Sequence, residues 1–205
     1  MIVLCMIVKR AQYPIRVWLP SAIAAPTPVS SLVHSSTLVT AGLFILIRAK
    51  PYDHYAIRDS IIVIMGSLIT TVSSYSAYSE YNIKKVVALS TLRQLGVMLT
   101  FIGFSQIEMA FCHLIIHAFF KRILFILRGV FLHENINNLD LRCSNSYNKF
   151  GYSIITAALA GHITLIGLPI TSSFFSKDLS IELSMSNIYI KVSTLILYIV
   201  AVEIA

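Results

Sequence analysis

The stretch AFCHLIIHAFFKRILFILRGVFLH, from Ala110 to His133, limits what this chain can fold into. At about 1.5 Å of rise per residue, a helix of this length crosses the roughly 30 Å hydrocarbon core of a bilayer. His113, His117 and Lys121 follow one another at four-residue intervals, so a helix places them in one stripe along one face. Ionisable side chains inside a membrane span are costly and normally face a bundle interior or a water-filled cavity. We therefore predict a membrane helix that turns a candidate proton relay towards the inside of a bundle.

Composition extends this prediction to the whole chain. The 205 residues are 57% hydrophobic and only 12% charged, with a mean hydropathy of +0.79. A soluble domain carries about twice that share of charge, and roughly 20 apolar residues suffice to cross a bilayer. We expect one all-α, polytopic transmembrane helix bundle over residues 1–205. Its expected elements are a leading half-helix at 1–13 and spans at 29–47, 60–79, 86–104, 110–133, 152–184 and 188–205.

Charge and cysteine content exclude several classes of function. The net charge of +7 does not indicate nucleic-acid binding, because the cations stand singly inside or beside apolar runs rather than in a basic stripe. Cys5, Cys112 and Cys143 are scattered without CxxC spacing, which favours free thiols over a metal site or a disulfide. The chain has no dinucleotide-binding glycine pattern, flavin motif or cysteine cluster. We therefore expect no cofactor in this chain.

Proline and glycine interrupt two of the expected helices. Pro14 should end the short helix that carries Lys9, and the sequence Gly167-Leu168-Pro169 breaks the helix that continues to Lys177 and Asp178. Broken helices at membrane depth are tolerated where they line a cavity, and they recur at ion sites. Two interpretations stay open for Lys9, an interfacial lysine or part of a proton path. Lys177 and Asp178 form either a surface pair or part of a buried ion path.

Histidine residues offer further alternatives. His34 lies in the polar sequence HSST of an otherwise apolar helix, where it either bonds to a neighbouring helix or joins the relay. His113 and His117, at positions i and i+4, also resemble half of a helical metal or haem site. That alternative is disfavoured, because the pair lacks the glutamate of HExxH and Lys121 on the same face would repel a metal cation.

Four motifs, taken in order, resemble one known family. They are WLPSAIAAPTPVSSLVHSSTLVTAGLFILIR, KKVVALSTLRQLGVM, AFCHLIIHAFFKRILF and GLPITSSFFSKDLSIE. They resemble the central part of subunit 5 of NADH dehydrogenase, the distal antiporter-like subunit of respiratory complex I. That family is related to subunits of multi-subunit sodium/proton antiporters. The resemblance runs from Lys9 to about Glu182.

The resemblance implies a buried proton path built from lysine and histidine. The matching positions are Lys9 beside the first broken helix, His34 in VHSST, the stripe of His113, His117 and Lys121, and Lys177 with Asp178 in SKD. The mechanism we expect is charge-coupled proton transfer. Desolvation disfavours a charged amine, so a buried lysine releases its proton when another cation approaches, and histidine bridges lysines through water. Successive shifts along Lys9, His34, His117, Lys121 and Lys177 would carry the coupling between half-channels.

Departures from the family pattern bear on the partners. Arg93 stands where the family usually has a small polar residue and Arg128 where it usually has a small one. These cations could meet phospholipid or a neighbouring subunit, or they could perturb the nearby row of lysine and histidine. The family glutamate that pairs with the first buried lysine, the early helices and the long lateral helix are not in this sequence. The expected partners are the other membrane-arm subunits, above all the adjacent antiporter-like subunit, a second chain with the N-terminal part, and lipids, with cardiolipin among the candidates.

The function implied is that of a membrane-arm subunit of NADH:ubiquinone oxidoreductase that takes part in proton translocation coupled to quinone reduction. Redox catalysis is not expected in this chain, and FMN, iron–sulfur clusters and ubiquinone would be bound elsewhere in the complex. Two alternatives stay open, a subunit of a multi-subunit sodium/proton antiporter and a structural remnant kept for assembly. The sequence APTPVSSLVHSSTLVTAG resembles mitochondrial members of the family, and together with the lack of a targeting signal it favours the mitochondrial inner membrane over a bacterial plasma membrane.

Overall fold

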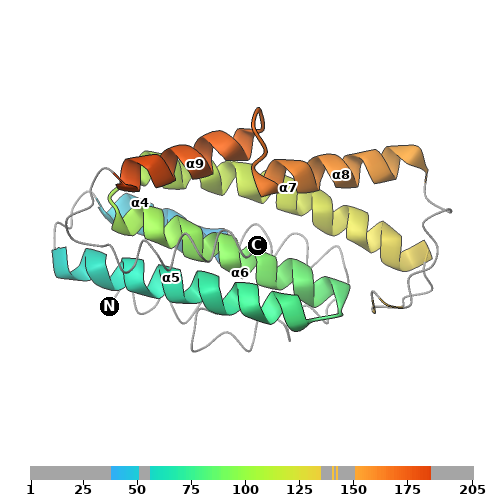
Figure 1. The fold of residues 1–205 in the computed structure, drawn as a ribbon, viewed down its shortest axis with the longest axis horizontal. Helices are drawn as coiled ribbons and strands as arrows, with labels where there is room; N and C mark the ends of the chain where they lie inside the picture. The colour runs from blue at the N-terminus through green and yellow to red at the C-terminus, as the bar shows by residue number, and fades with distance from the viewer. Residues whose placement is uncertain (1–37, 51–55, 135–139, 141, 143–150, 186–205) are drawn as a thin grey trace.

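The computed structural model describes residues 38–50, 56–134, 140, 142 and 151–185 (Figure 1). This part of the chain forms six helices: α4 (Leu38–Ala49), α5 (Ala56–Ser79), α6 (Ile83–Gly103), α7 (Ile107–Glu134), α8 (Tyr152–Ile166) and α9 (Ser172–Met185). The described residues contain no strand, only an isolated antiparallel bridge between Asn82 and Asp140. The predicted all-α class is therefore confirmed for them. The half-helix at 1–13 and the span at 188–205 lie outside the described residues.

Three of these helices are long and apolar enough to cross a membrane. They cover Arg58–Ser79, Ile83–Gly103 and Ile107–His133, and two shorter apolar helices cover Thr40–Ala49 and Tyr152–Ile166. A span of about 20 apolar residues matches the hydrocarbon thickness of a bilayer. The chain is therefore a multi-pass membrane protein.

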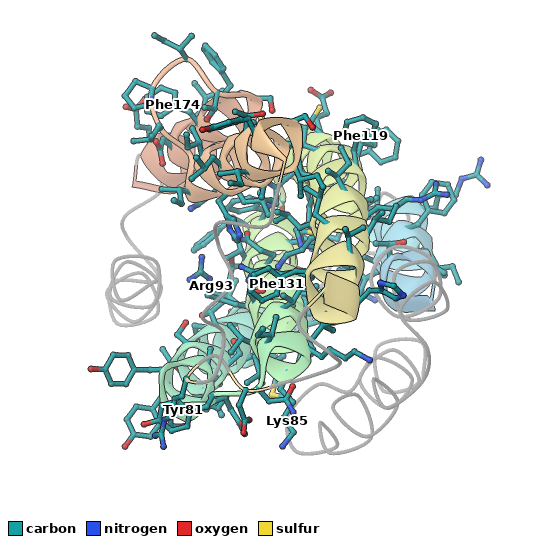
Figure 2. All side chains as sticks on the ribbon, turned by 90° about the vertical axis from the view of Figure 1, so that its right-hand side faces the viewer. Tyr81, Lys85, Arg93, Phe119, Phe131 and Phe174 are labelled. Atoms are coloured by element: carbon teal, nitrogen blue, oxygen red, sulfur yellow. The ribbon has the colours of Figure 1, made fainter. Side chains whose placement is uncertain are left out.

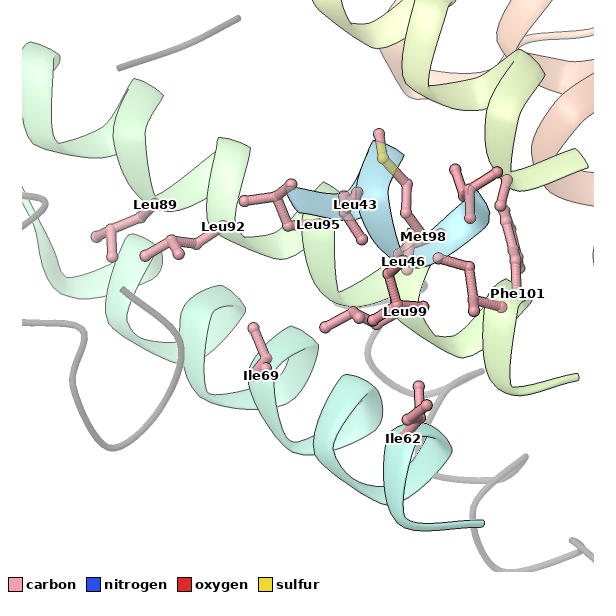
Figure 3. Packing of buried hydrophobic residues seen from close by; sticks show 14 of the residues in the cluster. Leu43, Leu46, Ile62, Ile69, Leu89, Leu92, Leu95, Met98, Leu99 and Phe101 are labelled. Carbon is pink, nitrogen blue, oxygen red and sulfur yellow. The ribbon is translucent and has the colours of Figure 1, made fainter. Parts of the chain in front are cut away.

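Helix α6 is the centre of the bundle. Within its most apolar window 83% of the residues are buried, against 44% for α5 and 39% for α7. Apolar side chains of α4 and α5 pack against those of α6 in one hydrophobic cluster. Figure 3 labels these members of it: Leu43, Leu46, Ile62, Ile69, Leu89, Leu92, Leu95, Met98, Leu99 and Phe101. Burial of these side chains fixes which face of α6 is left for polar contacts.

Small residues bring α5 and α6 into close contact. A β-carbon built on Gly66 would lie 2.9 Å from the carbonyl oxygen of Gly96, and one built on Gly103 would lie 2.4 Å from a methyl group of Val63. Small residues let membrane helices approach each other closely, because lipid offers no hydrophobic driving force between them. At the start of α5, near Val63, Lys50 donates a hydrogen bond to Asp59 and so joins the end of α4 to α5.

Helices α8 and α9 lie along α7, one after the other (Figure 1). The predicted break between them is confirmed. Helix α8 ends at Gly167 in the left-handed conformation, with φ of +88°, and Ile170 also has a positive φ of +81°. Glycine adopts this conformation at little cost, whereas it is strained for a β-branched residue. Pro169, between them, cannot donate the backbone hydrogen bond that would continue α8.

The bundle seen along its length is layered. Figure 2 shows Phe174 of α9 and Tyr81, next to the end of α5, on opposite sides, with Arg93 of α6 between them. In this view Arg93 of α6 thus lies between the α8–α9 layer and the end of α5.

Candidate functional site

The polar stripe of α7 faces the inside of the bundle. His113 and His117 are each 1% exposed and Lys121 is 4% exposed, whereas Ile115 and Phe119 of the same helix are 53% and 63% exposed. The helix therefore turns its ionisable side chains inward and its large apolar side chains outward. That arrangement suits a helix whose outer face meets lipid or other apolar surfaces.

His113 joins three helices through its two ring nitrogens. Nδ1 lies 2.9 Å from Oγ of Ser176 on α9, and Nε2 lies 3.1 Å from Oε1 of Gln94 on α6. Gln94 is 4% exposed and Ser176 is 3% exposed, so both contacts are shielded from solvent. The ring of Phe101 packs edge-on against the imidazole at a centroid distance of 6.1 Å. These contacts fix both the position and the plane of the ring.

His117 lies one helical turn farther along α7. Its ring is stacked beside that of His113, with centroids 6.4 Å apart and an interplanar angle of 28°. Neither ring nitrogen of His117 has a hydrogen-bond partner among the described residues. A buried imidazole without protein partners is unusual, and such groups are commonly satisfied by water or used in proton transfer.

Lys121 reaches across to α6. Its ammonium group donates to the hydroxyl of Ser90 and, at 3.4 Å, to the carbonyl oxygen of Val87. Lys121 also interacts electrostatically with Arg93 and Arg128. The amine is therefore held at α6 among other cations, within the span of α7.

Lys177 comes from α9, beyond the helix break. It is 6% exposed, and its ammonium group donates to the carbonyl oxygen of Ile166 at 3.3 Å. This carbonyl belongs to the last turn of α8, which has no further helical partner because the helix stops at Gly167. The break thus supplies an acceptor for the buried lysine. Asp178, half-buried, interacts electrostatically with Lys177.

These four groups form a series of neighbours. Lys177 interacts electrostatically with His113, His113 with His117, and His117 with Lys121. His113 therefore lies between Lys177 and His117, an order that the position of these residues along the chain does not reveal. Lys9 and His34, the other two predicted members, lie outside the described residues.

Sequence reasoning did not identify the side chains that hold the relay. Ser90, Gln94 and Ser176 were not predicted as site residues. The sequence features that could have indicated them are a glutamine in the middle of an apolar span and serines at positions 173, 176 and 180, which the structure shows to be buried in α9. Among the described residues, no three His, Cys, Asp or Glu side chains come together as metal ligands.

A second polar contact lies at an apolar groove between α7 and α8. The groove has a volume of about 220 Å³ and is lined by Leu124, Leu127, Arg128, Phe131, Ile154, Ile155, Ala158, Leu159 and His162. Nη2 of Arg128 lies 3.1 Å from Nε2 of His162. A guanidinium group has only donors, so His162 accepts this hydrogen bond at Nε2.

The sequence as a whole matches one described family. The profile of the NADH:quinone oxidoreductase/Mrp antiporter transmembrane family matches residues 1–202. Among curated relatives, NADH-ubiquinone oxidoreductase chain 5 of Lumbricus terrestris is 41% identical over 185 residues, which are 90% of this chain and 32% of the relative. The protein of the same name from Locusta migratoria is 40% identical over 193 residues, or 93% and 34%. The chain spans about a third of the length of these relatives.

Solved structures share the fold. One chain of an archaeal membrane-bound sulfane sulfur reductase, a respiratory membrane complex, superposes with a TM-score of 0.86 at 21% identity, over 97% of this chain and 42% of that one. One chain of the Mrp complex from Dietzia sp. superposes with a TM-score of 0.82 at 25% identity, over 99% and 23%. Helix bundles of this arrangement therefore occur in membrane complexes with different overall chemistry.

Proposed function

This chain belongs to the NADH:quinone oxidoreductase/Mrp antiporter transmembrane family, and on that premise we propose that it works as an antiporter-like membrane subunit of respiratory complex I. Its role there is to take part in proton translocation coupled to quinone reduction. The redox reaction takes place elsewhere in the complex, on other subunits. The names of the relatives favour the mitochondrial inner membrane as its location.

One observation carries this proposal: four ionisable side chains from two helices lie buried next to one another inside the helix bundle. Lys177, His113, His117 and Lys121 are each at most 6% exposed. Burying ionisable groups in a membrane is costly, so a row of them favours a function that uses their charge. Groups that merely stabilise the fold would be replaced by apolar side chains at little cost.

The proposed steps move one proton at a time between neighbours. An ammonium group of Lys177 gives a proton to His113, which leaves a neutral amine and an imidazolium ion. The imidazolium passes a proton to His117, and His117 passes one to the neutral amine of Lys121. No electron moves and no bond other than N–H forms or breaks. Arg93 interacts electrostatically with both lysines, so one permanent positive charge acts on both ends of the row.

The test is removal of one charge at a time in the assembled complex. Lys121→Met and Lys177→Met keep a long apolar side chain and remove the titratable group. We expect proton translocation to be lost while the complex still assembles and oxidises NADH in uncoupled membranes. Arg122→Met is the matched control, because Arg122 adjoins Lys121 on α7 but is exposed. Proton-to-electron ratios equal to those of the unaltered complex in both lysine variants would refute the proposal.

A second candidate function is that of a subunit of a multi-subunit sodium/proton antiporter. The likeness to a chain of the Mrp complex at 25% identity favours it. Co-purification discriminates between the two. The complex I proposal expects this chain in the same detergent-solubilised particle as NADH dehydrogenase activity, whereas an antiporter subunit would separate from it.

A further inference from the structure

The two partners of His113 are both groups that can reverse the direction of their hydrogen bonds. We propose that Gln94 and Ser176 are positioning residues that let His113 gain and lose a proton without leaving a buried polar atom unpaired. This inference rests on the proposed function, because it assigns a role to two side chains in that same relay.

Ser176 provides the first reversible contact. Its oxygen lies 2.9 Å from Nδ1 of His113 and 3.1 Å from the carbonyl oxygen of Ser173 in its own helix. A serine hydroxyl has one hydrogen and two lone pairs. If the hydroxyl donates to the carbonyl of Ser173, its oxygen accepts from a protonated Nδ1. If it turns to donate to His113, its hydrogen meets an unprotonated Nδ1.

Gln94 provides the second reversible contact. Its side-chain amide faces Nε2 of His113 at 3.1 Å. The carbonyl oxygen of an amide accepts from a protonated Nε2, and its NH2 group donates to an unprotonated one. A half-turn of the amide exchanges the two with little change in shape. Which orientation prevails is therefore set by the protonation state of the ring.

Together the two side chains accommodate three states of His113. Both neutral tautomers and the imidazolium ion each find two complementary partners, after rotation of one hydroxyl and one amide. When His113 takes a proton from the ammonium group of Lys177, the ring gains one N–H, Lys177 becomes a neutral amine, and Gln94 and Ser176 keep all their own protons. Passing a proton on to His117 reverses the rotation.

His117 differs from His113 in its hydrogen-bond partners. Its two ring nitrogens have no hydrogen-bond partner among the described residues, so none of these residues can change its hydrogen bond when the ring gains or loses a proton. His113 is equally buried but has an adaptable partner on each side. An unsatisfied buried group costs far more than a made hydrogen bond gains, so the adaptable partners lower the cost of each change of state at His113.

The experiment compares proton translocation per NADH oxidised in complexes assembled with single variants. Gln94→Met removes the amide at nearly constant length, and Ser176→Ala removes the hydroxyl. Each should lower proton translocation about tenfold, the effect of losing one hydrogen bond to a charged group. Gln94→Glu should retain more activity than Gln94→Met, because a protonated carboxyl group still donates and accepts.

Two matched controls separate this role from packing. Ser173→Ala removes a buried hydroxyl three residues from Ser176 that has no partner among the described residues. Thr91→Val removes a buried hydroxyl of α6 whose hydrogen bond, among the described residues, goes to the carbonyl oxygen of Ala88 in its own helix. Both should translocate protons as the unaltered complex does. A loss in Ser173→Ala equal to that in Ser176→Ala would overturn the inference, since it would indicate a general packing effect.

Measuring the lysine variants alongside separates failure of the proposed function from failure of the role assigned to Gln94 and Ser176. Normal translocation in both the Lys121→Met and the Lys177→Met complexes contradicts the proposed function itself. Loss of translocation in the lysine variants, with normal translocation in Gln94→Met and Ser176→Ala, overturns only the role of the positioning residues. If Gln94→Met does not assemble, the comparison of Ser176→Ala with Ser173→Ala decides, because both are small changes on α9.

Discussion

Gly66 and Gly96 hold α5 and α6 in direct backbone contact. A β-carbon on Gly96 would lie 2.8 Å from the carbonyl oxygen of Gly66, and one on Gly66 would lie 2.9 Å from the carbonyl oxygen of Gly96. The obstacles on each side are a threonine methyl group, from Thr70 or Thr100, and the backbone, and the backbone cannot turn away as a side chain can. Gly96 is two residues from Gln94, so this crossing lies close to the residue of α6 that contacts His113.

Replacing Gly96 with alanine should therefore separate the two helices. We expect Gly96→Ala to lower the stability of the protein by about 1–3 kcal/mol, the usual cost of overpacking a close contact. Thermal unfolding in detergent measures the effect. Gly151→Ala is the control, because the nearest atom to its new β-carbon is Oγ of Ser153 at 3.8 Å. Equal stability of the two variants would contradict a rigid crossing.

Local sequence patterns predicted the elements of the site that depend on one helix alone. The spacing of His113, His117 and Lys121 places them on one face whatever surrounds the helix, and the cost of burying charge in lipid predicts that this face turns inward. The break after α8 follows from Gly167 and Pro169, whose effects are also local.

Contacts between helices could not be read from the same patterns. Gln94 and Ser176 meet His113 across sequence separations of 19 and 63 residues, and Arg128 meets His162 across 34. A buried glutamine or serine in an apolar helix is compatible with many neighbours. Only the arrangement of α6, α7, α8 and α9 decides which of them it contacts.

Breaking the ion pair between Lys50 and Asp59 should destabilise the protein, because both side chains are shielded from solvent. The two side chains are 5% and 18% exposed. Removing one partner leaves a shielded charge, so we expect Asp59→Asn to destabilise the protein by about 3 kcal/mol. Glu80→Gln is the control, because the Lys85–Glu80 pair is 3.8 Å apart and well exposed, and such pairs contribute less than about 1 kcal/mol. Comparable unfolding temperatures for both variants would speak against this assignment.

The contact between Arg128 and His162 predicts a difference between two substitutions of the histidine. His162→Gln keeps an acceptor for the guanidinium group at the apolar groove, whereas His162→Leu removes it. Arg128 and His162 are half-buried, so losing this hydrogen bond costs about 1 kcal/mol. We expect the leucine variant to unfold at a lower temperature than the glutamine variant. The opposite order would mean that His162 stabilises the groove through apolar contact instead.

The order of α5, α6 and α7 predicts that the turn between α5 and α6 and the turn between α6 and α7 lie on opposite sides of the membrane. Tyr78, at the end of α5, is 91% exposed, and tyrosines concentrate at membrane interfaces. Glu108, also exposed, begins α7, one span away across α6. After replacement of the native cysteines by serine, a membrane-impermeant maleimide should label Tyr78→Cys from one side only and Glu108→Cys from the other only. Phe119→Cys, exposed near the middle of α7, should stay unlabelled because lipid surrounds it. Labelling of both turns from the same side would show that α6 does not cross the bilayer.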